Sequence, residues 1–189
     1  PNMATMLVFV TSDVDISPEM LQKALSHDVE DSFNMISVDG DTSTNDMVSV
    51  MASGLAGNKK ITGEGEDYSA FCEALGAVTK NLCRKIAKDG EGATKLITCR
   101  VSGAKDKPTA KIVAKSVISS SLFKAAMFGA DANWGRVLCA VGYSGADIDV
   151  NKIDVSFSSK NGSVEVCAAG SGVDFSEEKA KDVLSSDEV

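Results

Sequence analysis

The longest regular pattern in the sequence is an apolar stripe between Asp67 and Lys88. Its members recur at steps of three and four residues: Tyr68, Phe71, Cys72, Leu75, Val78, Leu82, Cys83 and Ile86. This spacing is typical of a helix with one apolar face. Asp89-Gly90 follows directly and is a usual C-terminal signal. The stripe therefore predicts one long amphipathic helix that ends close to Lys88.

Short runs of β-forming residues are spread along the rest of the chain. Residues 5 to 11, T-M-L-V-F-V-T, predict a buried strand that ends at the turn-prone Ser12-Asp13. Residues 36 to 54 predict a strand, a polar turn and a second strand, and the alternation over residues 93 to 103 predicts another strand. Lys160-Asn161-Gly162 predicts a hairpin, because Asn-Gly tolerates the positive φ angles of a tight turn.

Helices are expected between these runs. Ser17-Pro18-Glu19 predicts the start of a helix that continues to about Asn34. A further helix is expected from Pro108 to the serine run at 119. Two short helices broken near Gly129 should follow, with Asp131 or Asn133 capping the second, and a last helix should begin at about Ser176. Strand and helix thus alternate throughout, without an internal repeat. The predicted fold class is α/β, a mixed sheet layered with helices.

The composition predicts one globular domain over residues 1 to 189. A chain of 189 residues that is 43% hydrophobic is long enough for one well-packed core. Its 19 Lys and Arg against 27 Asp and Glu give a net charge of -8, and the basic residues are scattered. This balance argues against nucleic acid or an anionic membrane as a partner. No signal peptide or membrane-spanning run is visible, so the expected location is the cytoplasm, or the mitochondrial matrix in a eukaryote.

Metal-binding patterns are weak in this sequence. The five cysteines are an odd number and match neither a C-x-x-C pair nor a zinc ligand set: Cys72, Cys83, Cys99, Cys139 and Cys167. We expect reduced, mostly buried thiols. The polar turn from Asp39 to Asp46 mixes carboxylates with hydroxyls, but no Glu closes an EF-hand loop, so local side-chain-to-backbone bonding is expected there. We therefore expect no bound metal and no cofactor.

The usual catalytic motifs are missing, including a G-x-S-x-G elbow, a Walker A loop and a G-x-G-x-x-G after a strand. His27 is the sole histidine and lies in a polar helical segment, where an exposed position is expected. A Ser, Thr or Cys nucleophile would therefore need another base. A threonine that begins a chain carries nucleophile and base together, because the pKa of a free α-amino group is about 8.

Ala4-Thr5 is the candidate for such a site. If the bond between these residues is cut, Thr5 gains a free amine, and the strand behind it holds its hydroxyl at a fixed place in the fold. The alternative is that Thr5 is simply the first residue of a buried strand. Spacing alone leaves both interpretations open, since Ala-Thr pairs before strands are common.

Four longer segments stand out when the sequence is taken as a whole: P-N-M-A-T-M-L (1 to 7), S-F-N-M-I-S-V-D-G-D-T-S-T-N-D (32 to 46), D-G-E-G-A-T-K (89 to 95) and F-G-A-D-A-N-W-G-R (128 to 136). In content and order they resemble the motifs of the ornithine acetyltransferase family, also called glutamate N-acetyltransferases. The resemblance covers nearly the whole chain, and four long motifs in register are a specific signal.

The resemblance implies a self-processing acyltransferase of the N-terminal-nucleophile type, made as a precursor that cuts itself between Ala4 and Thr5. Thr5 would then take the acetyl group from N-acetylornithine and pass it to glutamate, a step of arginine biosynthesis. Some family members also accept acetyl-CoA. Glu91 of the D-G-E-G-A-T-K motif matches the family's substrate-binding carboxylate, so Glu91 is expected to bind an ammonium group of ornithine or glutamate.

The resemblance also implies a partner. In the family, the oxyanion donors and a substrate-binding Lys lie in the N-terminal half of the precursor, and a further Asn and Thr lie near its C-terminus, outside this chain. We therefore expect the N-terminal half of the same precursor as partner, assembled as a heterotetramer of two cleaved precursors. Without that half, the chain is expected to be inactive.

Some features depart from the family pattern or leave other functions open. Ala130 and Ala132 stand where relatives often have Glu and Pro, and Met35 stands where a basic residue is common. The turn from Asp39 to Asp46 and the N-W-G-R segment are expected to be structural, with Trp134 as a packing anchor.

Because residues 1 to 4 precede Thr5, one alternative function is an inactive fragment or binding module. Another is a related self-processing amidase or aminopeptidase that hydrolyses peptides.

Overall fold

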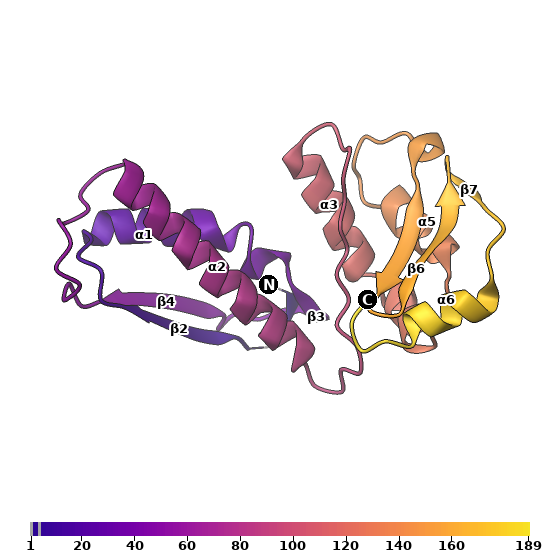
Figure 1. The fold of residues 1–189 in the computed structure, drawn as a ribbon, viewed down its shortest axis with the longest axis horizontal. Coiled ribbons are helices and arrows are strands. Elements are labelled where there is room, and N and C mark those ends of the chain that lie inside the picture. Colours follow the sequence, from indigo (N-terminus) through magenta and orange to yellow (C-terminus); the bar gives the residue numbers. More distant parts are fainter. Residues whose placement is uncertain (1, 4) are drawn as a thin grey trace. The chain divides into compact units, whose positions relative to one another are not determined.

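The computed structural model describes residues 2–3 and 5–189. Contacts divide the chain into two compact units, Pro1–Ala87 (unit 1) and Lys88–Val189 (unit 2), and each is described by itself. Figure 1 shows the elements of both units. The single domain predicted from composition stays a prediction.

Unit 1 combines two parallel strand pairs with helices. Its elements are β1 (Asn2–Met3), β2 (Leu7–Ser12), α1 (Pro18–Val29), the 3-10 helix η1 (Phe33–Met35), β3 (Ser37–Thr42), β4 (Met47–Ala52) and α2 (Glu66–Lys88). β1 pairs with β3, and β2 pairs with β4 in an unbroken register from Leu7↔Met47 to Ser12↔Ala52. The stripe between Asp67 and Lys88 is thus confirmed as one long helix, α2.

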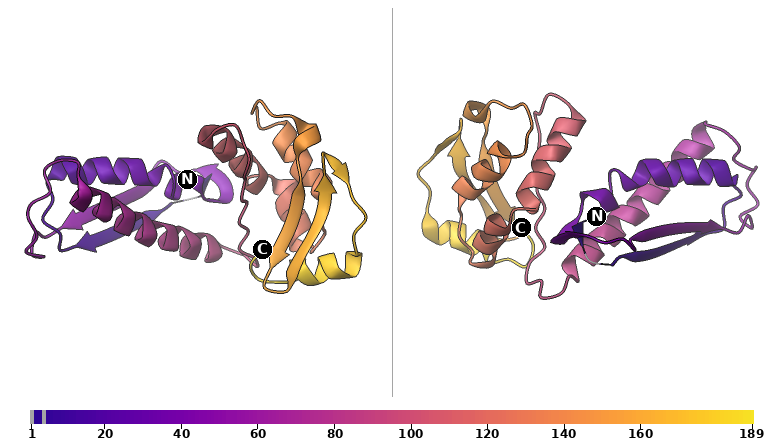
Figure 2. Two further views of the ribbon diagram at one scale, coloured as in Figure 1. Left: turned by 45° about the horizontal axis from the view of Figure 1, so that its top comes forward. Right: turned by 180° about the vertical axis from the view of Figure 1, so that it is seen from behind.

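Helices α1 and α2 lie on one side of the β2–β4 pair, as both views of unit 1 show (Figures 1 and 2). Val8 and Val48 of the two strands share one apolar cluster with Phe33 of η1 and Cys83 of α2. A second cluster joins Ile16 and Met20 to Ile61 and the first turns of α2. Most of the predicted stripe of α2 is therefore on the covered side, but Val78 is 46% exposed and Thr79, which the prediction left out, is buried.

The other side of the β2–β4 pair is exposed within unit 1. Leu7 and Phe9 are 60% and 61% exposed, and their neighbours Met47 and Met51 on β4 are 40% and 50% exposed. The strand predicted as buried is therefore buried on one face only. Successive side chains of a strand point to opposite faces, and the helices of this unit cover one of them. We call Leu7, Phe9, Met47 and Met51 the open face.

Helix α1 is shorter than predicted. It ends at Val29, and η1 follows, although the sequence predicts helix as far as Asn34. The Ser32 hydroxyl donates to the Asp28 carbonyl oxygen at 2.8 Å and to Asp28 Oδ2 at 3.0 Å. Such local side-chain bonds offer the backbone an alternative to the helix, which explains the early end. The predicted start is confirmed, because Ser17 Oγ accepts from the Met20 N–H.

Unit 2 packs helices and an antiparallel sheet around one core. Its elements are α3 (Lys107–Ile118), α4 (Ser121–Phe128), α5 (Trp134–Gly142), η2 (Val150–Lys152), β5 (Val155–Ser159), β6 (Gly162–Ala168), β7 (Ser171–Gly172) and α6 (Glu177–Leu184). The sheet order is β5-β6-β7. Met127, Ala140, Val166 and Leu184 are among its most buried side chains. The predicted hairpin is confirmed, but Ser159 pairs with Gly162, so Lys160-Asn161 form its turn and Gly162, with a φ of 131°, begins β6.

The strand predicted over residues 93 to 103 is wrong. Only Leu96 forms a bridge there, with Glu188 at the end of the chain. The Leu96 N–H donates to the Asp187 carbonyl at 2.9 Å, and the Val189 N–H donates to the Leu96 carbonyl at 3.0 Å. The segment still packs against the core through Ile97, Cys99 and Val101, so the alternation predicted correctly which side chains face inward. The Thr98 N–H also donates to the Val189 carbonyl oxygen at 2.8 Å, but these bonds do not extend into a strand.

No helix in the described ranges is both long and apolar enough to cross a membrane.

Substitution of Gly170 tests the tight turn between β6 and β7. Gly170 has a φ of 73°, and a Cβ there would lie 2.3 Å from the Val150 carbonyl oxygen. We expect Gly170→Ala to lower the free energy of unfolding by about 2 to 4 kcal/mol, measured by denaturant titration. Gly142→Ala, at the end of α5 with no atom within 4 Å of the new Cβ, is the control and should be nearly neutral. Equal stability of the two variants would contradict the packing described here.

The different burial of the cysteines predicts different rates of alkylation. All five are free, but the prediction that most are buried is wrong: Cys83 and Cys167 are buried, Cys72 and Cys99 are half-buried, and Cys139 is exposed. Burial raises the pKa of Cys83 to about 12 and that of Cys99 to about 11, so both remain thiols near pH 8. Because the thiolate is the nucleophile, iodoacetamide should alkylate exposed Cys139 first and leave Cys83 and Cys99 unmodified in the folded protein. Peptide mass spectrometry after short labelling gives the order, and denatured protein, with all five modified, is the control.

Candidate nucleophile site

Thr5 lies in an exposed loop position between β1 and β2. The strand predicted over residues 5 to 11 begins at Leu7, so Thr5 precedes the strand and is not its first residue. The other half of the predicted cleavage bond, Ala4, lies outside the described residues. Thr5 is therefore an accessible hydroxyl, two residues before a strand that is paired along its full length.

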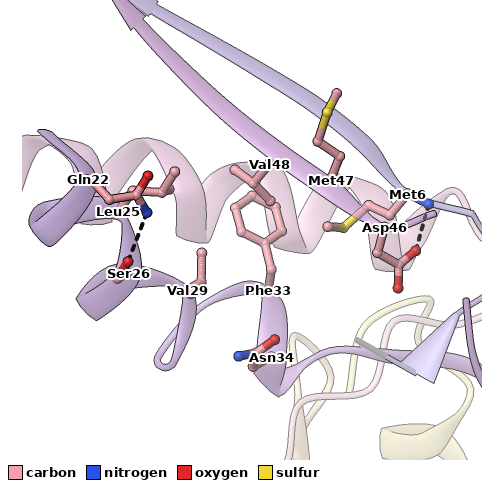
Figure 3. A pocket seen from close by; sticks show the side chains of 10 residues that line it. All are labelled: Met6, Gln22, Leu25, Ser26, Val29, Phe33, Asn34, Asp46, Met47 and Val48. Carbon is pink, nitrogen blue, oxygen red and sulfur yellow. Dashed lines mark hydrogen bonds between the residues drawn. The ribbon is translucent and has the colours of Figure 1, made fainter. Parts of the chain in front are cut away.

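The residue after Thr5 is held firmly. The Met6 N–H donates to Asp46 Oδ1 at 2.9 Å, and the Met6 carbonyl accepts from the Met47 N–H at 2.8 Å. The Met6 side chain is 4% exposed and belongs to the apolar cluster that contains Phe33. The Met6 backbone is thus bonded to Asp46 on one side and to Met47, the first residue of β4, on the other, and Figure 3 draws the bond to Asp46. This arrangement fixes the peptide bond that joins Thr5 to Met6.

Asp46 differs from the rest of its turn. Asp39 Oδ1 accepts from the Asp41 N–H at 2.9 Å and Ser43 Oγ from the Asn45 N–H at 3.0 Å, as the sequence predicts for this segment. Asp46 instead bonds a residue 40 positions away. Its second oxygen, Oδ2, is buried and has no hydrogen-bond partner among the described residues. Sequence reasoning missed this role, because one acid among several in a polar turn carries no sign of its distant contact.

A cavity of about 260 Å³ adjoins Met6 and Asp46. Residues of α1, η1 and β4 line it, and most of them are apolar (Figure 3). Its other polar residues are Gln22, Ser26 and Asn34. Gln22 Nε2 donates to Ser26 Oγ at 3.0 Å, and Asn34 Nδ2 donates to Glu30 Oε1 at 3.1 Å. Asp46 is the only titratable residue among those that line the cavity.

Glu91 lies in unit 2, in the turn that follows α2, and its side chain is exposed. The Ala93 N–H donates to the Gly90 carbonyl at 2.9 Å, and Gly92 has a φ of 71°, which glycine adopts without strain. Thr5 belongs to unit 1, and each unit is described separately. The prediction that Thr5 and Glu91 serve one substrate site therefore stays a prediction.

Lys95 anchors the D-G-E-G-A-T-K segment. Its Nζ donates to the Met127 carbonyl oxygen at 2.8 Å and also to the Leu184 carbonyl oxygen. Met127 lies in the last turn of α4, and Leu184 ends α6. A cation at a helix C-terminus bonds carbonyls that lack a partner in the helix and interacts favourably with the dipole. Burial lowers the pKa of Lys95.

The other motif residues have structural roles. Asn133 caps α5 by accepting from the Arg136 N–H at 3.2 Å. Trp134 packs against the core of unit 2, and a Cβ on Gly172 would lie 2.6 Å from its Cζ2. Trp134 is thus a packing anchor, as predicted. Ala130, one of the departures from the family pattern, has a φ of 51°.

Metal ligands do not converge in the part of the chain that the structure describes, where no group of three or more His, Cys, Asp or Glu is placed to hold an ion. His27 is exposed in the last turn of α1. The candidate site therefore consists of Thr5, the Met6–Asp46 bond and the adjoining cavity.

The fold is that of a solved bacterial protein. The crystal structure of arginine biosynthesis bifunctional protein argJ from Bacillus halodurans superimposes with a TM-score of 0.88. The two sequences are 46% identical, and the match covers 97% of this chain and 83% of that one. The α/β class predicted from the alternation of strand and helix is confirmed.

The chain belongs to the ArgJ family, whose sequence model matches residues 1–189. Arginine biosynthesis bifunctional protein ArgJ 1 of Clostridium acetobutylicum is 54% identical over 189 residues, which are 100% of this chain and 46% of that protein. The ArgJ protein of Thermotoga neapolitana is 50% identical over the same length, 48% of its own. The chain spans about half the length of the curated relatives it matches. The family membership expected from the four motifs is confirmed.

Replacement of Lys95 tests the anchor of the Glu91 segment. Lys95→Met keeps the length of the side chain but leaves the helix-end carbonyls of Met127 and Leu184 without their donor. We expect a loss of about 1 to 2 kcal/mol in the free energy of unfolding, measured by urea titration. Lys105→Met is the control, since its partner Asp147 is exposed and the pair should contribute less than about 0.5 kcal/mol. A Lys95 variant as stable as the control would show that the two bonds add nothing.

Proposed function

We propose that the chain is the nucleophile-bearing part of a glutamate N-acetyltransferase, with Thr5 as the catalytic nucleophile. The observation that carries the proposal is an exposed Thr5 next to a backbone fixed at Met6, in a chain of the ArgJ family. The relatives are named arginine biosynthesis bifunctional proteins, which supports a role in that pathway. The reaction would transfer an acetyl group from N-acetylornithine to glutamate.

Self-cleavage would prepare the nucleophile. The Thr5 hydroxyl oxygen attacks the Ala4 carbonyl carbon, the Ala4–Thr5 amide bond breaks, and the hydroxyl proton passes to the departing nitrogen. Water then hydrolyses the resulting ester, which releases the Ala4 carboxylate and restores the Thr5 hydroxyl. The product begins with a Thr5 that carries a free α-amine, as an N-terminal nucleophile needs.

Acetyl transfer would follow in two balanced steps. The Thr5 hydroxyl oxygen bonds to the acetyl carbon of N-acetylornithine, and its proton moves through the α-amine to the departing amine of ornithine. The amine of glutamate then attacks the acetyl-Thr5 ester and releases N-acetylglutamate, while the proton returns to the Thr5 oxygen. The α-amine is suited to this task, because its pKa is close to the operating pH. The route uses no cofactor and no metal.

The partner would be the N-terminal half of the same precursor. The curated relatives are about twice as long as this chain, which leaves room for a second part of similar size. The open face of β2 and β4 supports such a partner, because Leu7 and Phe9 are large apolar side chains that are more than half exposed. In this proposal, that half supplies the oxyanion donors and the substrate-binding Lys. A heterotetramer of two cleaved precursors is the proposed assembly, with the cytoplasm as its location.

Chain lengths within the family support the cleavage. The match covers 83% of the solved Bacillus halodurans chain but 46% of the Clostridium acetobutylicum protein. The solved chain is therefore much shorter than that curated relative. A family whose precursors are divided into two chains would give this difference.

Glu91 would bind the substrate. Its carboxylate is exposed on a turn between two glycines, so a small ammonium ion has free access to it. We assign it the ammonium group of ornithine or glutamate. Acetyl-CoA would be a second donor if the same site admits it.

Replacement of Thr5 tests the proposed function. In the full-length precursor, Thr5→Ala should abolish cleavage and lower acetyl transfer by about 10,000-fold or more, because the covalent nucleophile is lost. N-terminal sequencing measures cleavage, and chromatography of N-acetylglutamate measures transfer. Thr62→Ala, in the exposed loop that precedes α2, is the control and should behave as the wild type.

The outcomes separate the alternatives. Transfer by the Thr5→Ala precursor would overturn the proposal. A wild-type precursor that stays joined through Ala4 and takes no acetyl label on Thr5 would favour the binding module. Cleavage at Thr5 followed by peptide hydrolysis without N-acetylglutamate would favour the amidase or aminopeptidase.

A further inference from the structure

We propose that Asp46 is a positioning residue for Thr5. Its Oδ1 fixes the backbone after the nucleophile, and its Oδ2 receives the α-ammonium group that cleavage creates on Thr5. The inference rests on the proposed function, since that group exists only in a chain that begins at Thr5.

The first oxygen places the carboxylate beside the nucleophile. Asp46 Oδ1 accepts from the Met6 N–H at 2.9 Å, and β4 holds the Met6 carbonyl through Met47 at 2.8 Å (Figure 3). Only the Cα and the carbonyl carbon of Thr5 separate its α-nitrogen from the Met6 nitrogen. A carboxylate bonded to the Met6 N–H is therefore a close neighbour of the Thr5 amine, wherever the rest of the substrate site lies.

The second oxygen lacks a donor. Asp46 Oδ2 is buried and has no hydrogen-bond partner among the described residues, and no dashed line reaches it in Figure 3. A buried carboxylate oxygen without a partner is costly, so native proteins rarely leave one unexplained. Before cleavage, the Thr5 nitrogen belongs to a peptide bond and offers one proton. An α-ammonium group offers three, and its charge matches that of the carboxylate.

The neighbouring side chains do not take this role. Gln22 and Asn34, the amides in the cavity lining, donate to Ser26 and Glu30. The cavity residues from α1, η1 and β4 include no charged side chain except Asp46. On α2, Cys83 shares the apolar cluster of Met6, and burial raises its pKa to about 12, so it is uncharged at neutral pH. Asp46 thus supplies the carboxylate that lies next to the start of the mature chain.

The arrangement has a chemical consequence for the base. An anion next to an ammonium group stabilises its charged form and raises its pKa. The Thr5 amine would then be a stronger base, held in one orientation as it takes the hydroxyl proton. Removal of the charge should move the acid limb of the pH–rate profile to lower pH, because the free amine then persists in more acidic solution.

Asp46→Asn tests the roles of the two carboxylate oxygens separately. Asparagine keeps a carbonyl oxygen for the Met6 N–H but replaces the anionic Oδ2 with a donor. The assembled enzyme is made from both halves, with Thr5 encoded directly after an initiator Met that the host aminopeptidase removes, so that a failure of self-cleavage does not decide the result. The control is Asp41→Asn, which removes an exposed charge from β3, five residues before Asp46.

For Asp46→Asn we expect kcat for N-acetylglutamate formation to fall by about 10- to 100-fold. The acid limb of kcat/KM should move by about one pH unit toward lower pH. Thermal unfolding should stay close to that of the wild type, and Asp41→Asn should match the wild type in all three measurements. Asp46→Ala, which also loses the Met6 bond, should lower stability as well as rate.

An unchanged rate, or a lower rate with an unshifted acid limb, would overturn the proposal, since a purely structural Asp46 would not change the titration of the amine. A wild-type enzyme that forms no acetyl-Thr5 under the same conditions would instead overturn the proposed function. The mass of the labelled peptide that begins at Thr5 distinguishes the two failures.

Discussion

The parallel pairing of β2 with β4 is the constraint on which unit 1 depends. Parallel strands cannot be joined by a tight turn, so the chain between them must cross over, and here it does so through α1, η1 and β3. The bond from Met6 to Asp46 lies at the start of this pairing and joins positions 40 residues apart. This pairing determines the strand register, the burial of Val8 and the position of Thr5. An error of one residue in register would turn Val8 outward and Leu7 inward.

Unit 2 is organised by short-range signals instead. Lys160-Asn161 form the turn of the β5–β6 hairpin, and side-chain caps start its helices, with Asn133 at α5 as one example. Longer connections are few but specific. Lys95 joins the ends of α4 and α6, and Leu96 bridges to the last residues of the chain. The Glu91 turn therefore begins a segment that is bonded to three separate parts of the same core.

Sequence patterns predicted most of the elements, because amphipathic spacing, caps and hairpin signals are local. The helix α2 and the β5–β6 hairpin are examples. Failures occurred where a distant partner decides the outcome. Residues 93 to 103 alternate like a strand, but only Leu96 forms a bridge there, with Glu188. Asp46 looks like its neighbours in a polar turn until the fold brings it to Met6. For the site, the motifs gave Thr5 and Glu91 as candidates, but no periodicity could reveal an unpaired carboxylate oxygen.

The crossover between β2 and β4 also bears on when a self-cleaving chain matures. On the proposed function, the Thr5 hydroxyl reaches the preceding carbonyl only after Met6 has been fixed by Asp46 and Met47, which arrive some forty residues later in synthesis. A nascent or misregistered molecule would lack that geometry and stay in one piece. Scission would then act as a folding checkpoint, so that a newly exposed N-terminus marks molecules in which the non-local sheet has formed.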